Sequence, residues 1–209
     1  MRLAHTQDHG ALRDPTAAEP WRVLVSGCIA GLPCGVDGTD YGMGGALADF
    51  LALPTILALP FCPEDVGIGT PRTMPDIHGG DGRAVLRGEA RVLDQHGADL
   101  TDGMLAGARA MRDFAVSSRV ELAILTDMSA ACGSQVISLG CRFTQPRRYQ
   151  LGLGVAAAML DEAGVIIVSQ RDHRTLSLLR ARCDPGAEVD PEALDHHQHP
   201  WTRSHFSLT

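Results

Sequence analysis

The sequence predicts an α/β protein: a single domain whose mostly parallel sheet is flanked by helices in a Rossmann-like, three-layer arrangement, with one small β-hairpin. Short, apolar, β-rich runs recur along the chain and alternate with segments of helical periodicity. Strands that alternate with helices require right-handed crossovers, and such crossovers make neighbouring strands parallel. The chain has 209 residues, of which 44% are apolar, and this is enough for one domain with a sizeable core.

Four strands and four helices account for most of this domain. The strands are expected at residues 22–27, 55–61, 121–126 and 165–169. The helices are expected at residues 45–54, 100–118, 151–164 and 175–183. The segment AVLRGEARVLD (84–94) is interpreted as the hairpin, with its turn at Arg87-Gly88. Residues 63–83 are rich in Gly and Pro and have no period, which predicts a functional or disordered loop.

Two polar segments are expected to flank the domain, which spans residues 21–183. Residues 1–20 are predicted to be a polar leader, and residues 184–209 a polar, His-containing tail. The tail includes the cluster DHHQHP, whose histidines could hold a metal ion, but a segment without defined structure is the favoured interpretation.

Composition excludes several classes of function. The chain has no lysine and no asparagine, which removes P-loop and lysine-imine chemistry as well as a Cys-His-Asn arrangement. The 18 basic residues form no run longer than Arg147-Arg148 and the net charge is −7, which argues against a general nucleic-acid surface. No apolar stretch reaches the ~18 residues of a membrane span, and no secretory signal opens the chain. We therefore expect a cytoplasmic protein that does not enter membranes, and the sequence indicates no particular oligomeric state.

Three of the six cysteines stand at the carboxyl ends of predicted strands: Cys28 after RVLVSG, Cys62 after TILALPF, and Cys132 in the loop that follows ELAILT. The carboxyl ends of parallel strands meet at one edge of the sheet, where ligands bind beside the point at which the strand order reverses. The three thiols are therefore expected to converge. Each cysteine alone could instead be a small buried residue, and Cys132 could be a nucleophile with a low pKa. The five residues between Cys28 and Cys34 do not fit a C-x-x-C redox or zinc motif.

Polar residues accompany these cysteines. Glu64 stands two residues after Cys62, which makes it the best-placed titratable group for proton transfer, although a solvated carboxylate is the simpler interpretation. In the segment SAACGSQ (129–135), Ser134 could direct its hydroxyl group at a sulfur-bound ligand. Asp76 and His78 are the next candidates for the acid or base.

Four sequence blocks together resemble one bacterial family, formerly a domain-of-unknown-function family, that includes thiouracil desulfidase. The blocks are LVSGCIAGLPCGVDG, FCPEDVGIGTPRTMPDI, GADLTDGMLAGA and ELAILTDMSAACGS, and the resemblance runs from about Val23 to Gln170. The combination of blocks in this order is specific, whereas any one of them alone would be a moderate signal.

The resemblance implies a 4Fe-4S cluster held by only three cysteines, which would fall on Cys28, Cys62 and Cys132. It further implies a non-redox desulfidase that replaces the C=S group of a thiolated pyrimidine or related small thione by C=O, with release of sulfide. Glu64 would be the acid/base, and Ser134 or Ser129 a polar contact. Residues 21–183 would then be a cluster-binding catalytic domain. Thiolates suit iron–sulfur binding, and an open coordination position suits Lewis-acid chemistry.

The sequence departs from the family pattern at three places, and one alternative function stays open. Gly35-Val36 stands where the family usually has Arg-Tyr, Ser129-Ala130-Ala131 where it has Ser-Pro-Ser, and Asp76 where it commonly has Glu. These departures bear on the identity of the substrate more than on the cluster. The alternative is a non-catalytic metal or redox-sensing module, in which Cys34 joins the three strand-end cysteines in a closed four-thiolate site.

Overall fold

Four strands form the central sheet of the protein, in the order β2-β1-β5-β8 and all parallel. The computed structural model describes residues 9–45 and 47–208. The strands are β1 (Trp21–Ser26), β2 (Ile56–Phe61), β5 (Leu122–Leu125) and β8 (Ile166–Ser169). Each lies within one residue of its expected position, because a parallel sheet covered on both faces requires short and nearly continuous apolar runs. The predicted strands are confirmed.

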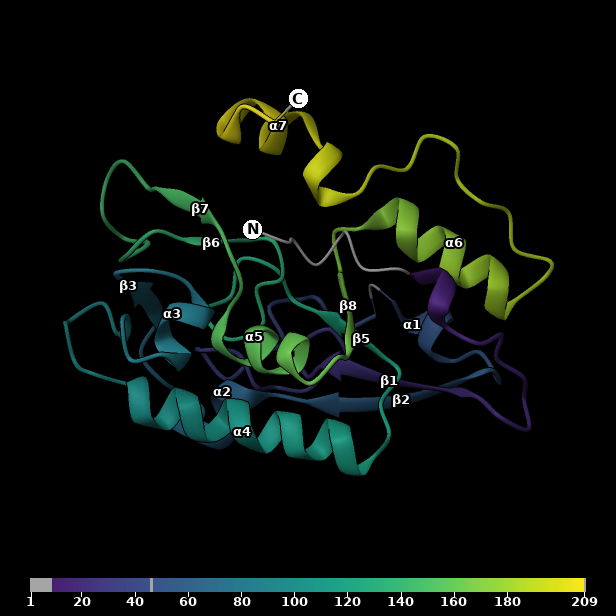
Figure 1. The fold of residues 1–209 in the computed structure, drawn as a ribbon, viewed down its shortest axis with the longest axis horizontal. Helices are drawn as coiled ribbons and strands as arrows, with labels where there is room; N and C mark the ends of the chain where they lie inside the picture. Colours follow the sequence, from purple (N-terminus) through teal and green to yellow (C-terminus); the bar gives the residue numbers. More distant parts are fainter. Residues whose placement is uncertain (1–8, 46, 209) are drawn as a thin grey trace.

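Helices cover both faces of this sheet and form three layers (Figure 1). On one face, side chains such as Leu24 and Ala123 pack against a group of helices in one core. These helices are α2 (Pro63–Ile68), α3 (Gly82–Leu86), α4 (Thr101–Ser117) and α5 (Val155–Glu162). On the other face, Val23 and Ile124 pack in a second core with residues of α1 (Ala48–Leu51) and α6 (His173–Cys183). The predicted single α/β domain with flanking helices is confirmed.

Residues 63–83, which the sequence predicts to be a loop, contain regular structure. Helix α2 begins directly after Cys62, and strand β3 (Asp76–His78) follows. Six residues of helix and three of strand are too few to show a period, so composition alone misidentified them. The segment is therefore part of the folded domain.

The predicted hairpin around Arg87-Gly88 is wrong in position. Residues before this turn form α3, whose first turn is capped by the Asp81 carboxylate through the Ala84 N–H (3.1 Å). Residues after it form β4 (Arg91–Leu93). This strand pairs antiparallel with β3, which precedes α3 in the chain, and not with the residues directly before the turn. A true hairpin lies elsewhere, between β6 (Val136–Ser138) and β7 (Tyr149–Leu151).

Helices α2 and α4 sit against each other because glycines replace side chains between them. A Cβ atom added at Gly107 of α4 would overlap the carbonyl oxygen of Pro63 in α2, and one added at Gly67 of α2 would overlap the carbonyl oxygen of Gly103. The absence of a side chain at Gly67 thus lets α2 approach α4. This contact sets the position of α2 and of the residues that it carries.

Gly107→Ala is expected to destabilise the protein by about 1–3 kcal/mol, because the added methyl group overpacks the α2–α4 contact. The better helix propensity of alanine offsets only ~1 kcal/mol of this effect. Urea unfolding of the reduced protein measures the change. Ala106→Ser, at an exposed position of the same helix, is the control and should change stability by about 0.5 kcal/mol or less. A Gly107→Ala protein as stable as the parent would contradict the packing argument.

The C-terminal residues are folded, so the expectation of a tail without defined structure is wrong. They form the 3-10 helix η3 (His196–Gln198) and helix α7 (Pro200–Phe206). In the leader, residues 1–8 lie outside the described part of the chain, and Leu12 is buried against the core. The boundaries of the domain at residues 21 and 183 stay predictions. Among the described residues, no helix is both long and apolar enough to cross a membrane.

Candidate active site

The structure brings the three strand-end cysteines together in one cavity of about 310 Å³. Cys28 lies in the loop after β1, Cys62 is the residue between β2 and α2, and Cys132 lies in the loop after β5. The strand order reverses at β1, which has β2 on one side and β5 on the other. The cavity therefore occupies the position at which α/β sheets bind ligands.

A fourth thiol, that of Cys34, lies among them and shapes their electrostatics. A hydrogen bond with the Cys34 thiol lowers the pKa of Cys28 to about 7, and the Thr126 hydroxyl, 3.0 Å from the Cys28 sulfur, acts in the same direction. A hydrogen bond with Cys34 likewise lowers the pKa of Cys62, assisted by the Asp65 N–H (3.4 Å). The same hydrogen bonds raise the pKa of Cys34. Two thiols in the cavity are thus biased toward the thiolate form, which binds metal.

The loop that carries Cys132 rests on the first turn of α5. Backbone N–H groups of Gly154, Val155 and Ala156 donate to carbonyl groups of this loop at 2.7–2.9 Å. A Cβ atom at Gly154 would overlap the Ala131 carbonyl group, so this glycine lets the start of α5 approach the loop. Burial in this tight loop raises the pKa of the Cys132 thiol.

Glu64 is 9% exposed and points into the same cavity, where two neighbours fix its carboxylate. Arg72 donates to Oε2 from both Nε (3.1 Å) and Nη2 (2.6 Å), and the Ser129 hydroxyl donates to Oε1 (3.0 Å). Ser129 in turn accepts the backbone N–H of Cys132 (3.0 Å). A continuous chain of hydrogen bonds therefore links the carboxylate to the third cysteine.

Arg72 is a residue of the site to which the sequence interpretation assigned no role. Its guanidinium group also donates to the carbonyl oxygen of Cys34 (3.0 and 3.1 Å) and to the Thr70 hydroxyl (2.8 Å). It thus ties α2, the Cys34 loop and the segment after α2 together. A signal was present, because Arg72 is the cation nearest in sequence to Glu64.

Other candidates lie outside the cavity. Ser134 is fully buried and does not line it; its N–H donates to Asp127 (3.0 Å). Asp76 is paired with Arg142 (2.8 Å), and His78 borders a different, smaller cavity beside Cys141. Of the two serines, the structure therefore places only Ser129 at the cavity, and Glu64 is the candidate acid or base that reaches it.

Apolar side chains form much of the cavity wall, namely Tyr41, Met43, Phe61, Met74 and Met128. One departure from the family pattern has a local cause here. A Cβ atom at Gly35 would lie 2.8 Å from the Tyr41 ring, and the Tyr41 hydroxyl accepts the N–H of Val36 (2.5 Å). Tyr41 thus packs where a side chain at position 35 would lie.

The C-terminal histidines do not form one metal site, because they face different partners. His196 is 3% exposed, and its Nδ1 lies 2.5 Å from Asp127 Oδ2. His197 lies near Asp172 and Asp195, with one potential ligand atom of each within 4.8 Å of the others. Both carboxylates already accept protein hydrogen bonds, from Gln135 and Thr175 among others. The less favoured interpretation, in which the histidines together hold one metal ion, finds no support in this arrangement.

An α/β domain that gathers cysteine thiols from three strand ends beside a buried carboxylate has the donor set that suits a thiophilic metal centre. The sequence profile of the 2-thiouracil desulfurase family matches residues 23–172, and the chain belongs to this family.

Two known proteins are similar to the chain. An uncharacterized protein of Bacillus subtilis (strain 168), YbbK, is 31% identical over 151 residues, which make up 72% of this chain and 96% of that protein. A solved structure described as the 4Fe-4S-dependent thiouracil desulfidase TudS is 28% identical, with a TM-score of 0.62 over 76% of this chain and 96% of that one.

Proposed function

We propose that the protein is an iron–sulfur-dependent, non-redox desulfidase of the cytoplasm that replaces C=S by C=O in a thiolated pyrimidine base, nucleoside or related small thione. One observation carries this proposal: Cys28, Cys62 and Cys132 share a single cavity with a fixed carboxylate, in a chain of the 2-thiouracil desulfurase family. Family membership supports the reaction, and the cavity supports the residues that would perform it.

The donor set fits a 4Fe-4S cluster. Cysteine thiolates are the usual ligands of such clusters, and here they come from three separate strand ends around one hollow. Cys28, Cys62 and Cys132 would hold the group. When bound through three cysteines, a cluster supplies one iron without a cysteine ligand, a Lewis-acidic position with affinity for sulfur.

Glu64 is the residue to which we assign proton transfer in the reaction. Replacing C=S by C=O consumes one water and releases one hydrogen sulfide, so both protons of the attacking water must leave its oxygen in turn, and the departing sulfur must gain two protons. Ser129 on Oε1 and Arg72 on Oε2 hold the Glu64 carboxylate in place, which suits it to accept the first proton and return it. Fixed orientation of this kind lowers the entropic cost of the step.

The charges around the cavity favour a neutral substrate. Among the described residues that line it, the two arginines are both paired, Arg72 with Glu64 (2.6 Å) and Arg142 with Asp76 (2.8 Å). Among the described residues that line the cavity, no unpaired arginine is therefore available to bind a phosphate group. Apolar walls with several methionines suit the face of a flat ring, because methionine adapts its shape and contacts aromatic groups well. A thiolated base or nucleoside fits these features better than a nucleotide.

Anaerobic reconstitution with iron and sulfide tests the proposal. We expect a brown protein with broad absorbance at ~400 nm, as iron–sulfur clusters show. It should release sulfide from at least one member of a panel of thiouracils, thiouridines and thioureas. A protein that stays colourless and iron-free after reconstitution would contradict the cofactor, and a loaded protein inactive on the whole panel would contradict the substrate class.

A second candidate, a closed four-thiolate module without catalysis, is favoured by the hydrogen bonds that Cys34 makes with Cys28 and Cys62. Cys34→Ser separates the two functions. For the desulfidase we expect the variant to bind iron within about twofold of the parent, because three thiolates suffice; iron analysis after reconstitution measures this. Cys141→Ser, outside the cavity, is the matched control. Loss of iron from Cys34→Ser alone would favour the closed module.

A further inference from the structure

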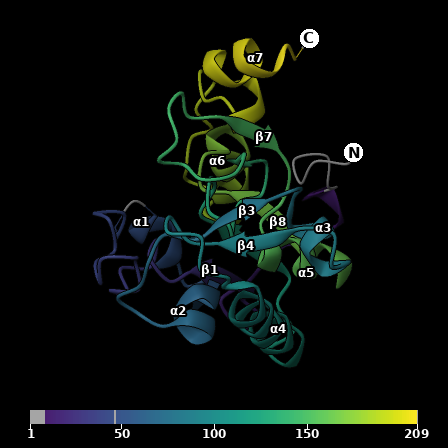
Figure 2. The same cartoon turned by 90° about the vertical axis from the view of Figure 1, so that its left-hand side faces the viewer.

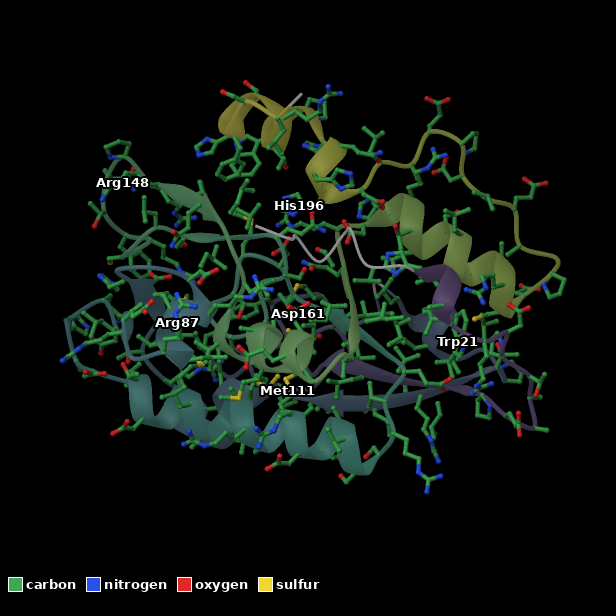
Figure 3. All side chains as sticks on the ribbon, in the orientation of Figure 1. Trp21, Arg87, Met111, Arg148, Asp161 and His196 are labelled. Carbon is green, nitrogen blue, oxygen red and sulfur yellow. The ribbon has the colours of Figure 1, made fainter. Side chains whose placement is uncertain are left out.

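The chain continues beyond its family match, and the continuation folds back onto the domain. The match ends at residue 172, and residues 173–208, here called the C-terminal segment, form α6, η3 and α7. Helix α7 lies beside β7 in both views (Figures 1 and 2). Trp201 of α7 packs edge-on against Tyr149 of β7, with ring centroids 5.2 Å apart. Figure 3 shows His196 between α7 and the body of the domain.

Asp127 closes the loop that carries the site residues. Residues 127–136, here called the Cys132 loop, leave β5 and return at β6, and they include Ser129. Oδ1 of Asp127 accepts backbone N–H groups from both ends of this loop, at Met128, Ser134, Gln135 and Val136 (3.0–3.2 Å). A single carboxylate oxygen therefore holds the two ends of the loop together.

The other oxygen of Asp127 is held by the C-terminal segment. Oδ2 lies 2.5 Å from His196 Nδ1 and 3.3 Å from the Ser169 hydroxyl. Because an ionised carboxylate only accepts hydrogen bonds, the Nδ1 atom must be the donor. The His196 backbone N–H donates to Asp172 Oδ1 (3.0 Å). His196 is therefore held through both its backbone and its imidazole ring. A fully buried carboxylate depends strongly on such donors.

We propose that His196 is a positioning residue of the active site, which acts through Asp127 to hold the Cys132 loop. The C-terminal segment then contributes to the active site of this chain, because its His196 holds Asp127 in place. The inference rests on the proposed function only in treating Ser129 and Cys132 as active-site groups.

Hydrogen–deuterium exchange on the reconstituted, full-length protein tests this role without substrate. In His196→Leu, we expect amides of residues 127–136 to exchange roughly 10- to 100-fold faster, which is the effect of losing one hydrogen bond to a charged group. In His196→Asn, the side-chain amide can replace the Nδ1–H donor, so exchange should return to within a few-fold of the parent. If His196→Leu does not fold, His196→Gln serves instead, because its amide reaches toward the Nε2 position and not the Nδ1 position.

Thr175→Val is the matched control. It removes a hydrogen bond to Asp195 (2.8 Å) that anchors the same C-terminal segment, but it does not touch Asp127. We expect amides of residues 127–136 to keep the parent rate in this variant. Equal acceleration in Thr175→Val and His196→Leu, or acceleration of α6 to the same extent as the loop, would show that His196 only anchors the segment and would overturn the proposal. Failure of His196→Asn to restore protection would overturn it as well. Exchange needs no turnover, so these outcomes are independent of whether the desulfidase activity is found.

Discussion

Glu64→Gln is expected to lower kcat for sulfide release by roughly 100- to 10,000-fold, the usual contribution of a general acid or base. The amide keeps the shape of the side chain and can still contact Ser129 and Arg72, but it cannot accept a proton from water. Because Glu64 is not a cluster ligand in the proposed site, iron content and the absorbance at ~400 nm should match the parent. Steady-state kinetics on the reconstituted enzyme, together with iron analysis, measure both effects.

Asp65→Asn is the matched control for this prediction. Asp65 is the next residue of α2, is exposed, and does not line the cavity, so its carboxylate has no access to the substrate. We expect this variant to retain kcat within about twofold, since exposed substitutions of this kind have small effects. A Glu64→Gln enzyme that turns over at the parent rate with a full cluster would contradict the acid/base assignment. The structure would offer neither Asp76 nor His78 as a replacement, because both lie outside the cavity.

Arg72→Met is expected to destabilise the protein by about 3–5 kcal/mol, the largest stability effect at the site. The Arg72 side chain is 5% exposed, and its loss leaves the Glu64 carboxylate buried without its cation. The Cys34 carbonyl oxygen also loses two donors, so the loop beside Cys28 and Cys62 should loosen. Urea unfolding of the reduced, iron-free protein is the appropriate measurement, because a bound metal centre violates two-state behaviour.

Two comparisons make this prediction specific. Arg87→Met removes an exposed ion pair with Glu89, in which the arginine side chain is 57% exposed, and should cost less than about 1 kcal/mol. Combining Arg72→Met with Glu64→Gln should recover part of the loss, because the uncompensated charge is then gone. If Arg72→Met costs no more than Arg87→Met, or if the two site substitutions are simply additive, the buried pair does not organise the cavity.

The four strands of the sheet were predictable because burial on both faces requires apolar runs that the sequence shows directly. The segments that were misread are short. Helix α2 and strand β3 have too few residues for a period, and β4 pairs with β3 across α3 and not with an adjacent strand. In the C-terminal segment, polar composition indicated a loose tail. His196 and Asp195 are nevertheless buried, because His196 bonds to Asp127 and Asp172, and Thr175 bonds to Asp195. Composition cannot distinguish solvated polar groups from buried, hydrogen-bonded ones.

The sequence by itself determined the α/β class, the four strand positions and, through its motifs, the family and the three strand-end cysteines. It could do so because strand ends are local features, and parallel strands bring their carboxyl ends to one edge wherever they lie along the chain. Only the tertiary structure decided which polar residues reach that edge. It brings Ser129, and not Ser134, to Glu64, pairs Arg72 with Glu64, and brings His196 into contact with Asp127. These choices depend on the direction of side chains in loops and on contacts between distant segments, which neither spacing nor composition encodes.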